Sequence, residues 1–130
     1  AKAREHVSLR KRATLLLLEG ELGAGKTALT KAIGRVLGVR ETITSPTFVI
    51  MKSYPIENDE HFDTLVHIDA YRIEDTDELR VLHFEELLHD TKNYIVIEWP
   101  ERIESILPSD APYMQLEIGK DNERIFTYGK

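Results

Sequence analysis

Residues 20–27 read Gly20-Glu21-Leu22-Gly23-Ala24-Gly25-Lys26-Thr27 and match the pattern G-x-x-x-x-G-K-[ST] in full. Glycines at these spacings let the backbone curl so that successive N–H groups point toward phosphate oxygens. The lysine of this pattern reaches the β- and γ-phosphates of a nucleotide, and the hydroxyl that follows it binds Mg²⁺. The stretch therefore predicts a nucleoside triphosphate site in which Lys26 binds phosphate and Thr27 binds the metal.

The flanking segments supply the setting that this pattern requires. Segment 14–19 contains four consecutive leucines, and a short continuous apolar run is typical of a parallel strand covered on both faces. Segment 26–37 is predicted to be an amphipathic helix that ends at Gly38. Its apolar residues, which we expect on the buried face, are Leu29, Ala32, Ile33, Val36 and Leu37. A strand, a glycine-rich loop and a helix in this order argue against a chance match.

The rest of the chain favours an α/β fold. Further strands are predicted at 47–54, 65–69 and 94–98, a single helix from 75–78 to 92–93, and loops at 55–63 and 99–112. Segments 113–118 and 123–128 alternate apolar and polar residues around a short turn, which is typical of a β-hairpin. The prediction is one P-loop NTPase-like domain over residues 1–130, with three layers, a mostly parallel central sheet and a C-terminal β-hairpin.

Two of the predicted strands end in a carboxylate. Asp69 ends the strand at 65–69, and Glu98 ends the strand at 94–98. Functional groups gather at the carboxyl ends of such strands, and magnesium-dependent phosphoryl transfer needs an acid there. We expect one carboxylate to belong to the Mg²⁺ shell and the other to polarise the attacking water, and spacing does not decide which is which. The alternative is that each carboxylate only caps the turn that follows it.

Two further groups are candidates on weaker grounds, and the histidines are not. Thr47, and after it Ser45, lie where nucleotide switches keep a hydroxyl that senses the γ-phosphate, although a plain Ser/Thr turn fits the same residues. Trp99 is the single tryptophan, and both stacking on a base or partner and packing in the core fit its position. The five histidines lack metal-ligand spacing and are interpreted as structural or surface groups.

Composition limits the classes of protein to which the chain can belong. It has no cysteine, which excludes disulfide scaffolds and thiolate metal sites, and it has no apolar stretch long enough for a membrane span. We therefore expect a cytoplasmic protein without a membrane partner. The net charge of −6 combines +6 over residues 1–40 with −12 over residues 41–130. Positive charge thus coincides with the phosphate-binding stretch, and the acidic remainder does not suit direct binding of RNA.

Six short motifs occur along the chain, and their combination is far more selective than the glycine-rich stretch alone. They are the stretch at 20–27, Ser-Pro-Thr-Phe at 45–48, His-Ile-Asp-Ala-Tyr-Arg at 67–72, Asp-Glu-Leu at 77–79, Ile-Glu-Trp-Pro-Glu at 97–101 and Leu-Pro at 107–108. Together they resemble the TsaE (YjeE) family of bacterial P-loop ATPases, which act in tRNA threonylcarbamoyladenosine (t6A) biosynthesis. The resemblance covers nearly the whole chain.

The resemblance implies a function, ligands and partners. It implies an ATP-binding subunit that supports t6A37 modification by joining the threonylcarbamoyl-transferase core, a Kae1/Gcp-like subunit and its dimerising partner. It also implies a Mg²⁺-dependent, partner-stimulated hydrolysis of ATP, with tRNA contacted only through the complex. By carry-over, the catalytic residues are Lys26, Thr47, Asp69 and Glu98, the metal ligands are Thr27, Asp69 and Glu98, and the ATP-binding residues are Glu21, Leu22, Gly23, Ala24, Gly25, Lys26, Thr27, Ala28 and Trp99.

The sequence departs from the family pattern in two places. It starts inside the segment that precedes the first strand, so the base-binding side is expected to be incomplete and the affinity reduced. Ala28 stands where a second threonine is frequent, which removes one hydroxyl but leaves Thr27 in place.

Two alternative functions remain open. One is a small-molecule P-loop kinase, although the arginines after Gly38 are scattered rather than clustered as in a lid. The other is a non-catalytic binding switch in which the nucleotide controls affinity for a partner.

Overall fold

A computed structural model describes residues 12–20, 25–44, 50–118 and 124–129. Within these ranges six strands form one sheet in the order β2-β3-β4-β1-β5-β6. The strands are β1 (Thr14–Gly20), β2 (Met51–Pro55), β3 (Thr64–Asp69), β4 (Asn93–Glu98), β5 (Tyr113–Ile118) and β6 (Arg124–Gly129). β1, β3, β4 and β5 run parallel, and the edge strands β2 and β6 are antiparallel to their neighbours. The mostly parallel sheet and the C-terminal β5–β6 pair predicted from the sequence are confirmed.

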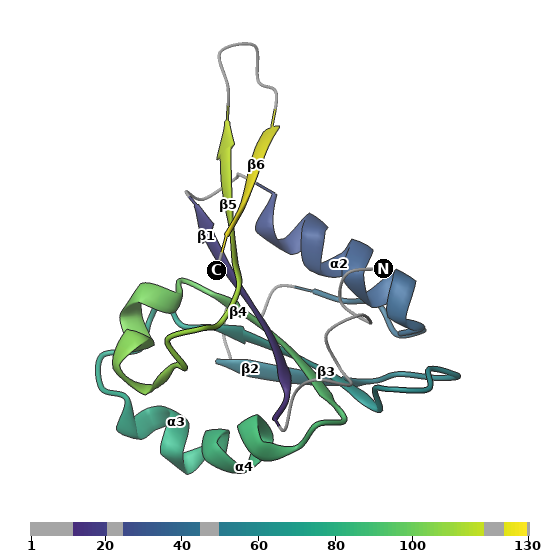
Figure 1. Cartoon of the computed structure of the whole chain (residues 1–130), viewed down its shortest axis with the longest axis horizontal. Coiled ribbons are helices and arrows are strands. Elements are labelled where there is room, and N and C mark those ends of the chain that lie inside the picture. The colour runs from purple at the N-terminus through teal and green to yellow at the C-terminus, as the bar shows by residue number, and fades with distance from the viewer. Residues whose placement is uncertain (1–11, 21–24, 45–49, 119–123, 130) are drawn as a thin grey trace.

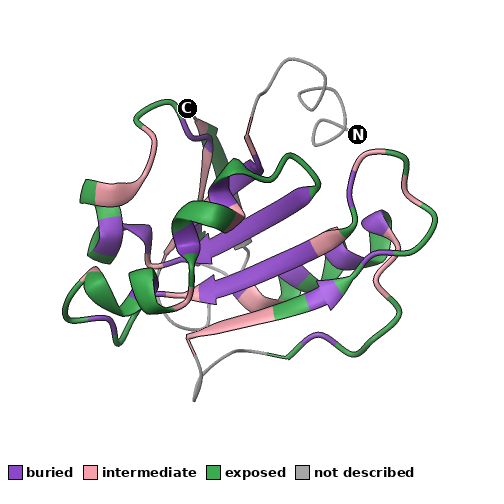
Figure 2. Ribbon diagram, turned by 90° about the horizontal axis from the view of Figure 1, so that it is seen from below, coloured by how far each residue is buried: buried purple, intermediate pink, exposed green. Residues whose placement is uncertain are grey.

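Helices cover both faces of the sheet (Figure 1). The helix α2 (Lys26–Leu37) lies on one face, and α3 (Asp77–Val81), α4 (Phe84–His89) and the 3₁₀ helix η2 (Pro100–Ile106) lie on the other. Successive side chains of a strand point to opposite faces, so Leu16 packs in the core under α2 while Leu15 packs in the core under α3 and α4. Figure 2 shows the central strands buried along most of their length, as expected for the middle of three layers.

α2 begins and ends at the predicted residues, but its buried face differs from the prediction. Val36 is 60% exposed and Ala32 is also exposed, so their assignment to the core was wrong. The helix instead turns Lys26, Thr30, Gly34 and Leu37 inward. Gly34 brings the helix close to the sheet layer, because a Cβ at that position would lie 2.3 Å from Cδ1 of Ile43. The first two turns of α2 thus direct the polar side chains of Lys26 and Thr30 inward.

The prediction of one helix from 75–78 to 92–93 was wrong, because His83 divides this segment into α3 and α4. His83 has a φ of 59°, in the left-handed region that ends a helix. In a continuous helix Leu79 and Phe84 would point about 140° apart. The break rotates α4 so that both side chains enter the same core. Packing against the sheet therefore overrides the local helical pattern.

Two loop boundaries also differ from expectation. Segment 100–106, expected to be loop, forms η2, which begins at Pro100. The strand predicted at 47–54 is seen as β2 from Met51, and residues 47–49 lie outside the described ranges. No helix among the residues that the structure describes is long and apolar enough to cross a bilayer.

Candidate nucleotide-binding site

The N-terminus of α2 is the part of the predicted phosphate site that the structure describes. Gly25 precedes the helix with a φ of 98°, a conformation that glycine adopts without strain. Its carbonyl accepts a hydrogen bond from the N–H of Leu29 at 2.9 Å. Among the residues that the structure describes, no side chain caps this end, and the first turn holds no acidic residue. The positive end of the helix dipole favours an anion such as phosphate at this end.

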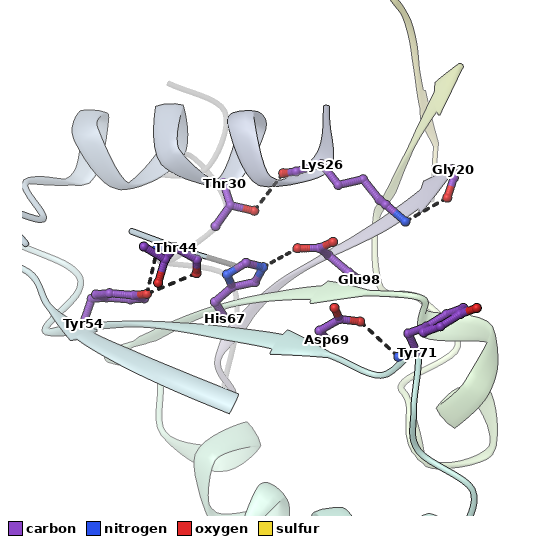
Figure 3. Close-up of polar contacts among 9 residues, drawn as sticks. All are labelled: Gly20, Lys26, Thr30, Thr44, Tyr54, His67, Asp69, Tyr71 and Glu98. Atoms are coloured by element: carbon purple, nitrogen blue, oxygen red, sulfur yellow. Dashed lines mark hydrogen bonds and ion pairs between the residues drawn. The ribbon is translucent and has the colours of Figure 1, made fainter. Parts of the chain in front are cut away.

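Lys26 is the first residue of α2 and lies buried beneath it. Its Nζ donates a hydrogen bond to the carbonyl of Gly20 at 2.8 Å (Figure 3) and lies 4.0 Å from the centroid of the Trp99 ring. Burial lowers the pKa of the lysine, while the nearby negative charges, of which Glu98 contributes most, oppose that shift. The ammonium group is thus held near carboxylates in surroundings that penalise its charge.

Asp69 and Glu98 lie side by side at the carboxyl ends of β3 and β4. They are partners in the parallel register of these strands. Asp69 accepts a hydrogen bond at Oδ1 from the N–H of Tyr71 at 3.0 Å. Burial raises the pKa of Asp69, the Tyr71 N–H opposes this, and the charge of Glu98 raises the pKa further. The structure thus brings together the two carboxylates singled out in the sequence, and their chemical roles stay predictions.

Two buried polar side chains under α2 were not singled out as site residues. Thr30 and His67 both have 0% exposure. Thr30 donates from Oγ1 to the carbonyl of Lys26 at 3.1 Å, and His67 Nε2 lies 2.5 Å from Oε2 of Glu98 (Figure 3). The alternation of strand residues offered a signal, because His67 precedes Asp69 by two positions and so shares its face. The interpretation of His67 as structural overlooked this contact with the site.

Trp99 joins the site to η2. Its φ of 58° is unusual for a bulky residue, and such backbone strain clusters at functional sites. The ring lies 4.9 Å from the ring of Tyr71, centroid to centroid, and Cζ of Arg102 lies 5.7 Å from the centroid of the Tyr71 ring. Trp99 also packs against the core under α3 and α4. Its position beside Lys26 places it near the phosphate end of the site, and its role in ATP binding stays a prediction.

The other predicted ligands lie partly outside the described residues. Thr27 is half-buried and Ala28 is exposed in the first turn of α2. The described ranges do not include Glu21, Leu22, Gly23, Ala24, Ser45 or Thr47.

The donors that are described fit Mg²⁺ as it is held in nucleotide sites. No cluster of three or more His, Cys, Asp or Glu side chains in the described ranges could hold a metal by itself. Magnesium is usually bound through one or two carboxylates together with substrate phosphates and water. The pair Asp69 and Glu98, with the hydroxyl of Thr27, supplies hard oxygen ligands of that kind.

Replacing Asp69 by asparagine is expected to stabilise the free protein. Because burial raises the pKa of Asp69 above its ordinary value of 3.8, the folded state binds this proton more tightly than the unfolded chain. Stability therefore falls as pH rises from 3.8 through the raised pKa, and at neutral pH the charged carboxylate is destabilising. We expect Asp69→Asn to raise the Tm at neutral pH by about 2–5 °C, with the gain vanishing near pH 4.

The matched control for that measurement is Asp63→Asn, at an exposed position just before β3. Thermal unfolding of both variants over a pH series separates burial of charge from a general effect of removing an acid. A lower Tm for Asp69→Asn at neutral pH would contradict the prediction.

Comparison with known proteins identifies the family. The family model described as "Threonylcarbamoyl adenosine biosynthesis protein TsaE" matches residues 1–126. The chain belongs to the TsaE family. This agrees with the order of motifs, and the fold agrees as well: the crystal structure of YdiB from Bacillus subtilis matches 97% of this chain and 74% of its own length, with a TM-score of 0.68 and 29% identity.

Two curated members of the TsaE family are similar to most of this chain. The tRNA threonylcarbamoyladenosine biosynthesis protein TsaE of Streptomyces coelicolor is 49% identical over 88 residues, which are 67% of this chain and 57% of that protein. The protein of the same name from Bacillus subtilis is 39% identical over 114 residues, or 88% of this chain and 68% of that protein. The chain thus spans between 57% and 68% of the length of these two relatives.

Proposed function

We propose that this chain is an ATP-binding and ATP-hydrolysing subunit that supports t6A37 modification of tRNA by a threonylcarbamoyl-transferase complex. The observation that carries the proposal is the cluster of Lys26, Asp69 and Glu98 at the start of α2, in which Lys26 and Glu98 are buried and Asp69 is half-buried. Lys26 belongs to a complete G-x-x-x-x-G-K-[ST] stretch, and the chain is a member of the TsaE family. The names of the relatives supply the pathway, and the cluster supplies the groups that phosphoryl transfer needs.

The residues divide the chemical work between them. Lys26 exchanges its hydrogen bond with Gly20 for the β- and γ-phosphates of ATP, while the first turn of α2 directs its N–H groups at the same oxygens. Asp69, whose charge is penalised in the free protein, would hold Mg²⁺ together with Thr27. Glu98, more deeply buried and held by His67, orients and polarises the attacking water. When bound, Mg²⁺ supplies positive charge that neutralises phosphate oxygens.

The charge distribution supports an indirect contact with tRNA. Residues 41–130 carry a net charge of −12, and RNA binding depends on Lys and Arg contacts to phosphate. We propose that the acidic part of the chain meets protein partners, namely the Kae1/Gcp-like subunit and its dimerising partner. Tight binding of tRNA by the isolated chain, with a steep dependence on salt, would contradict this division of roles.

The experiment that tests the proposal measures ATP hydrolysis by the chain alone, with the purified transferase core, and with the core and tRNA. We expect slow hydrolysis by the chain alone, faster hydrolysis with the core, and repeated rounds of t6A formation only when all are present. A phosphorylated metabolite in a substrate screen would instead support the kinase. Equal complex assembly with ATP and a non-hydrolysable analogue, without turnover, would support the binding switch.

A further inference from the structure

We infer that His67 is a positioning residue for Glu98: its imidazole holds one carboxylate oxygen and keeps the carboxylate from pairing with Lys26. The inference rests on the proposed function, in which Glu98 acts on the attacking water. It concerns a side chain that touches neither phosphate nor water in that scheme. His67 acts only through Glu98.

The burial of His67 calls for a specific partner. The residue lies on β3 with 0% exposure, on the face that it shares with Leu65 and Asp69, beneath the first turns of α2 (Figure 3). Polar side chains are costly to bury unless a hydrogen bond replaces the lost water. The partner is Glu98, 31 positions later in the chain, whose Oε2 lies 2.5 Å from Nε2.

The surroundings of the ring determine its tautomer. An ionised Glu98 can only accept, so Nε2 must carry the proton that is donated. Nδ1 is shielded from solvent and has no hydrogen-bond partner in the part of the chain that the structure describes. A second proton there would leave a buried N–H donor without an acceptor, which is unfavourable. We therefore assign the neutral tautomer with the proton on Nε2.

The geometry around Glu98 shows what this hydrogen bond accomplishes. Lys26 and Glu98 attract each other, and both are buried. Lys26 nevertheless bonds to the carbonyl of Gly20, while Glu98 bonds to His67. If Lys26 and Glu98 formed a direct ion pair, the ammonium group would be less available to phosphate and the carboxylate less available to water. By holding Oε2, His67 leaves Lys26 available for phosphate and leaves Oε1 as the oxygen that can reach water.

Two substitutions separate the hydrogen bond from the volume of the ring. His67→Gln keeps a donor at a position close to that of Nε2, whereas His67→Leu fills similar space without a donor. With the transferase core present, we expect His67→Leu to lower kcat by about 100-fold, as expected for a displaced catalytic group, with KM for ATP within about twofold. His67→Gln should recover kcat to within about fivefold of wild type, because the donor is restored.

The controls separate positioning from folding. Thermal unfolding is measured for each variant, and His89→Gln, at an exposed position on α4, serves as a neutral histidine substitution. Normal kcat in a folded His67→Leu protein would overturn the inference. Equal loss in His67→Gln and His67→Leu would also overturn it, because size rather than the donor would then matter.

A measurement without ATP hydrolysis keeps the inference separate from the proposed function. The ring ¹⁵N shifts of His67 in the wild-type protein should show a protonated Nε2 and an unprotonated Nδ1. The Hε2 resonance should move in Glu98→Ala and stay in place in Glu101→Ala, which removes an exposed acid on η2. A proton on Nδ1 alone would overturn the inference even in an active enzyme. The expected ring shifts would support the His67–Glu98 hydrogen bond even if the wild-type protein hydrolysed no ATP. Lack of hydrolysis would contradict the proposed function and not this hydrogen bond.

Discussion

Replacing Lys26 by alanine is expected to abolish ATP-dependent activity and to weaken ATP binding by about 100-fold, because a charged hydrogen bond to phosphate is lost. Nζ already lies at the start of α2, 2.8 Å from the carbonyl of Gly20 and 4.0 Å from the centroid of the Trp99 ring. When ATP binds, Nζ therefore needs only to exchange one hydrogen-bond acceptor, the neutral carbonyl of Gly20, for another, an anionic phosphate oxygen. Binding is read from the fluorescence of Trp99, the only tryptophan in the chain, and by calorimetry, which does not depend on that contact.

Loss of activity in this variant should not come from unfolding. Burial lowers the pKa of Lys26 below its ordinary value of 10.5, so the folded state binds this proton less tightly than the unfolded chain does. The charged lysine is therefore destabilising below the lowered pKa, and alanine removes that penalty together with one hydrogen bond. We expect a Tm within a few degrees of wild type. Lys31→Ala, exposed on the same helix, should leave binding and turnover unchanged. Normal turnover by Lys26→Ala would exclude the assigned role of the lysine.

Features set by neighbouring residues in the chain were predictable from the sequence. The leucine run, the helical spacing after Lys26 and the glycine at position 38 fixed β1 and α2 almost to the residue. The pairing of Asp69 with Glu98 followed from similar reasoning, since each ends a buried strand and parallel strands end at the same edge. The signals for β1 and α2 come from neighbouring residues. The signal for the carboxylate pair needs only one rule of sheet geometry to place distant residues together.

Features that depend on contacts between distant segments were not predictable in the same way. The outward orientation of Val36 follows from how closely Gly34 lets α2 approach Ile43. The break at His83 follows from the need to bury Leu79 and Phe84 in one core. His67 has no ligand spacing to mark it, because its partner lies 31 residues away. In each case the local sequence is compatible with more than one conformation of similar energy, and packing against distant segments selects one of them.

Replacing Glu98 by glutamine is expected to reduce hydrolysis far more than nucleotide binding. Glutamine keeps the size of the side chain and can still accept from His67, but it cannot polarise water as a base. We expect kcat with the transferase core to fall by about 100- to 1,000-fold, the range for loss of a general base, while the Kd for ATP changes by about twofold or less. Glu101→Gln, an exposed acid three residues further along, is the matched control.

The comparison of Glu98→Gln with Asp69→Asn assigns the two carboxylates. If Asp69 faces the metal, Asp69→Asn should raise the Mg²⁺ concentration needed for half-maximal hydrolysis, whereas Glu98→Gln should lower the rate at saturating Mg²⁺. If Glu98→Gln instead changes the Mg²⁺ requirement and Asp69→Asn lowers the rate at saturating Mg²⁺, the two carboxylates exchange roles. The cluster would then still be the catalytic site. If Glu98→Gln instead weakens binding first, with unchanged hydrolysis per bound nucleotide, then Glu98 only organises the site. In that case the buried pair with His67 would serve to hold Lys26 in its phosphate-binding place, and the attacking water would be activated by another group.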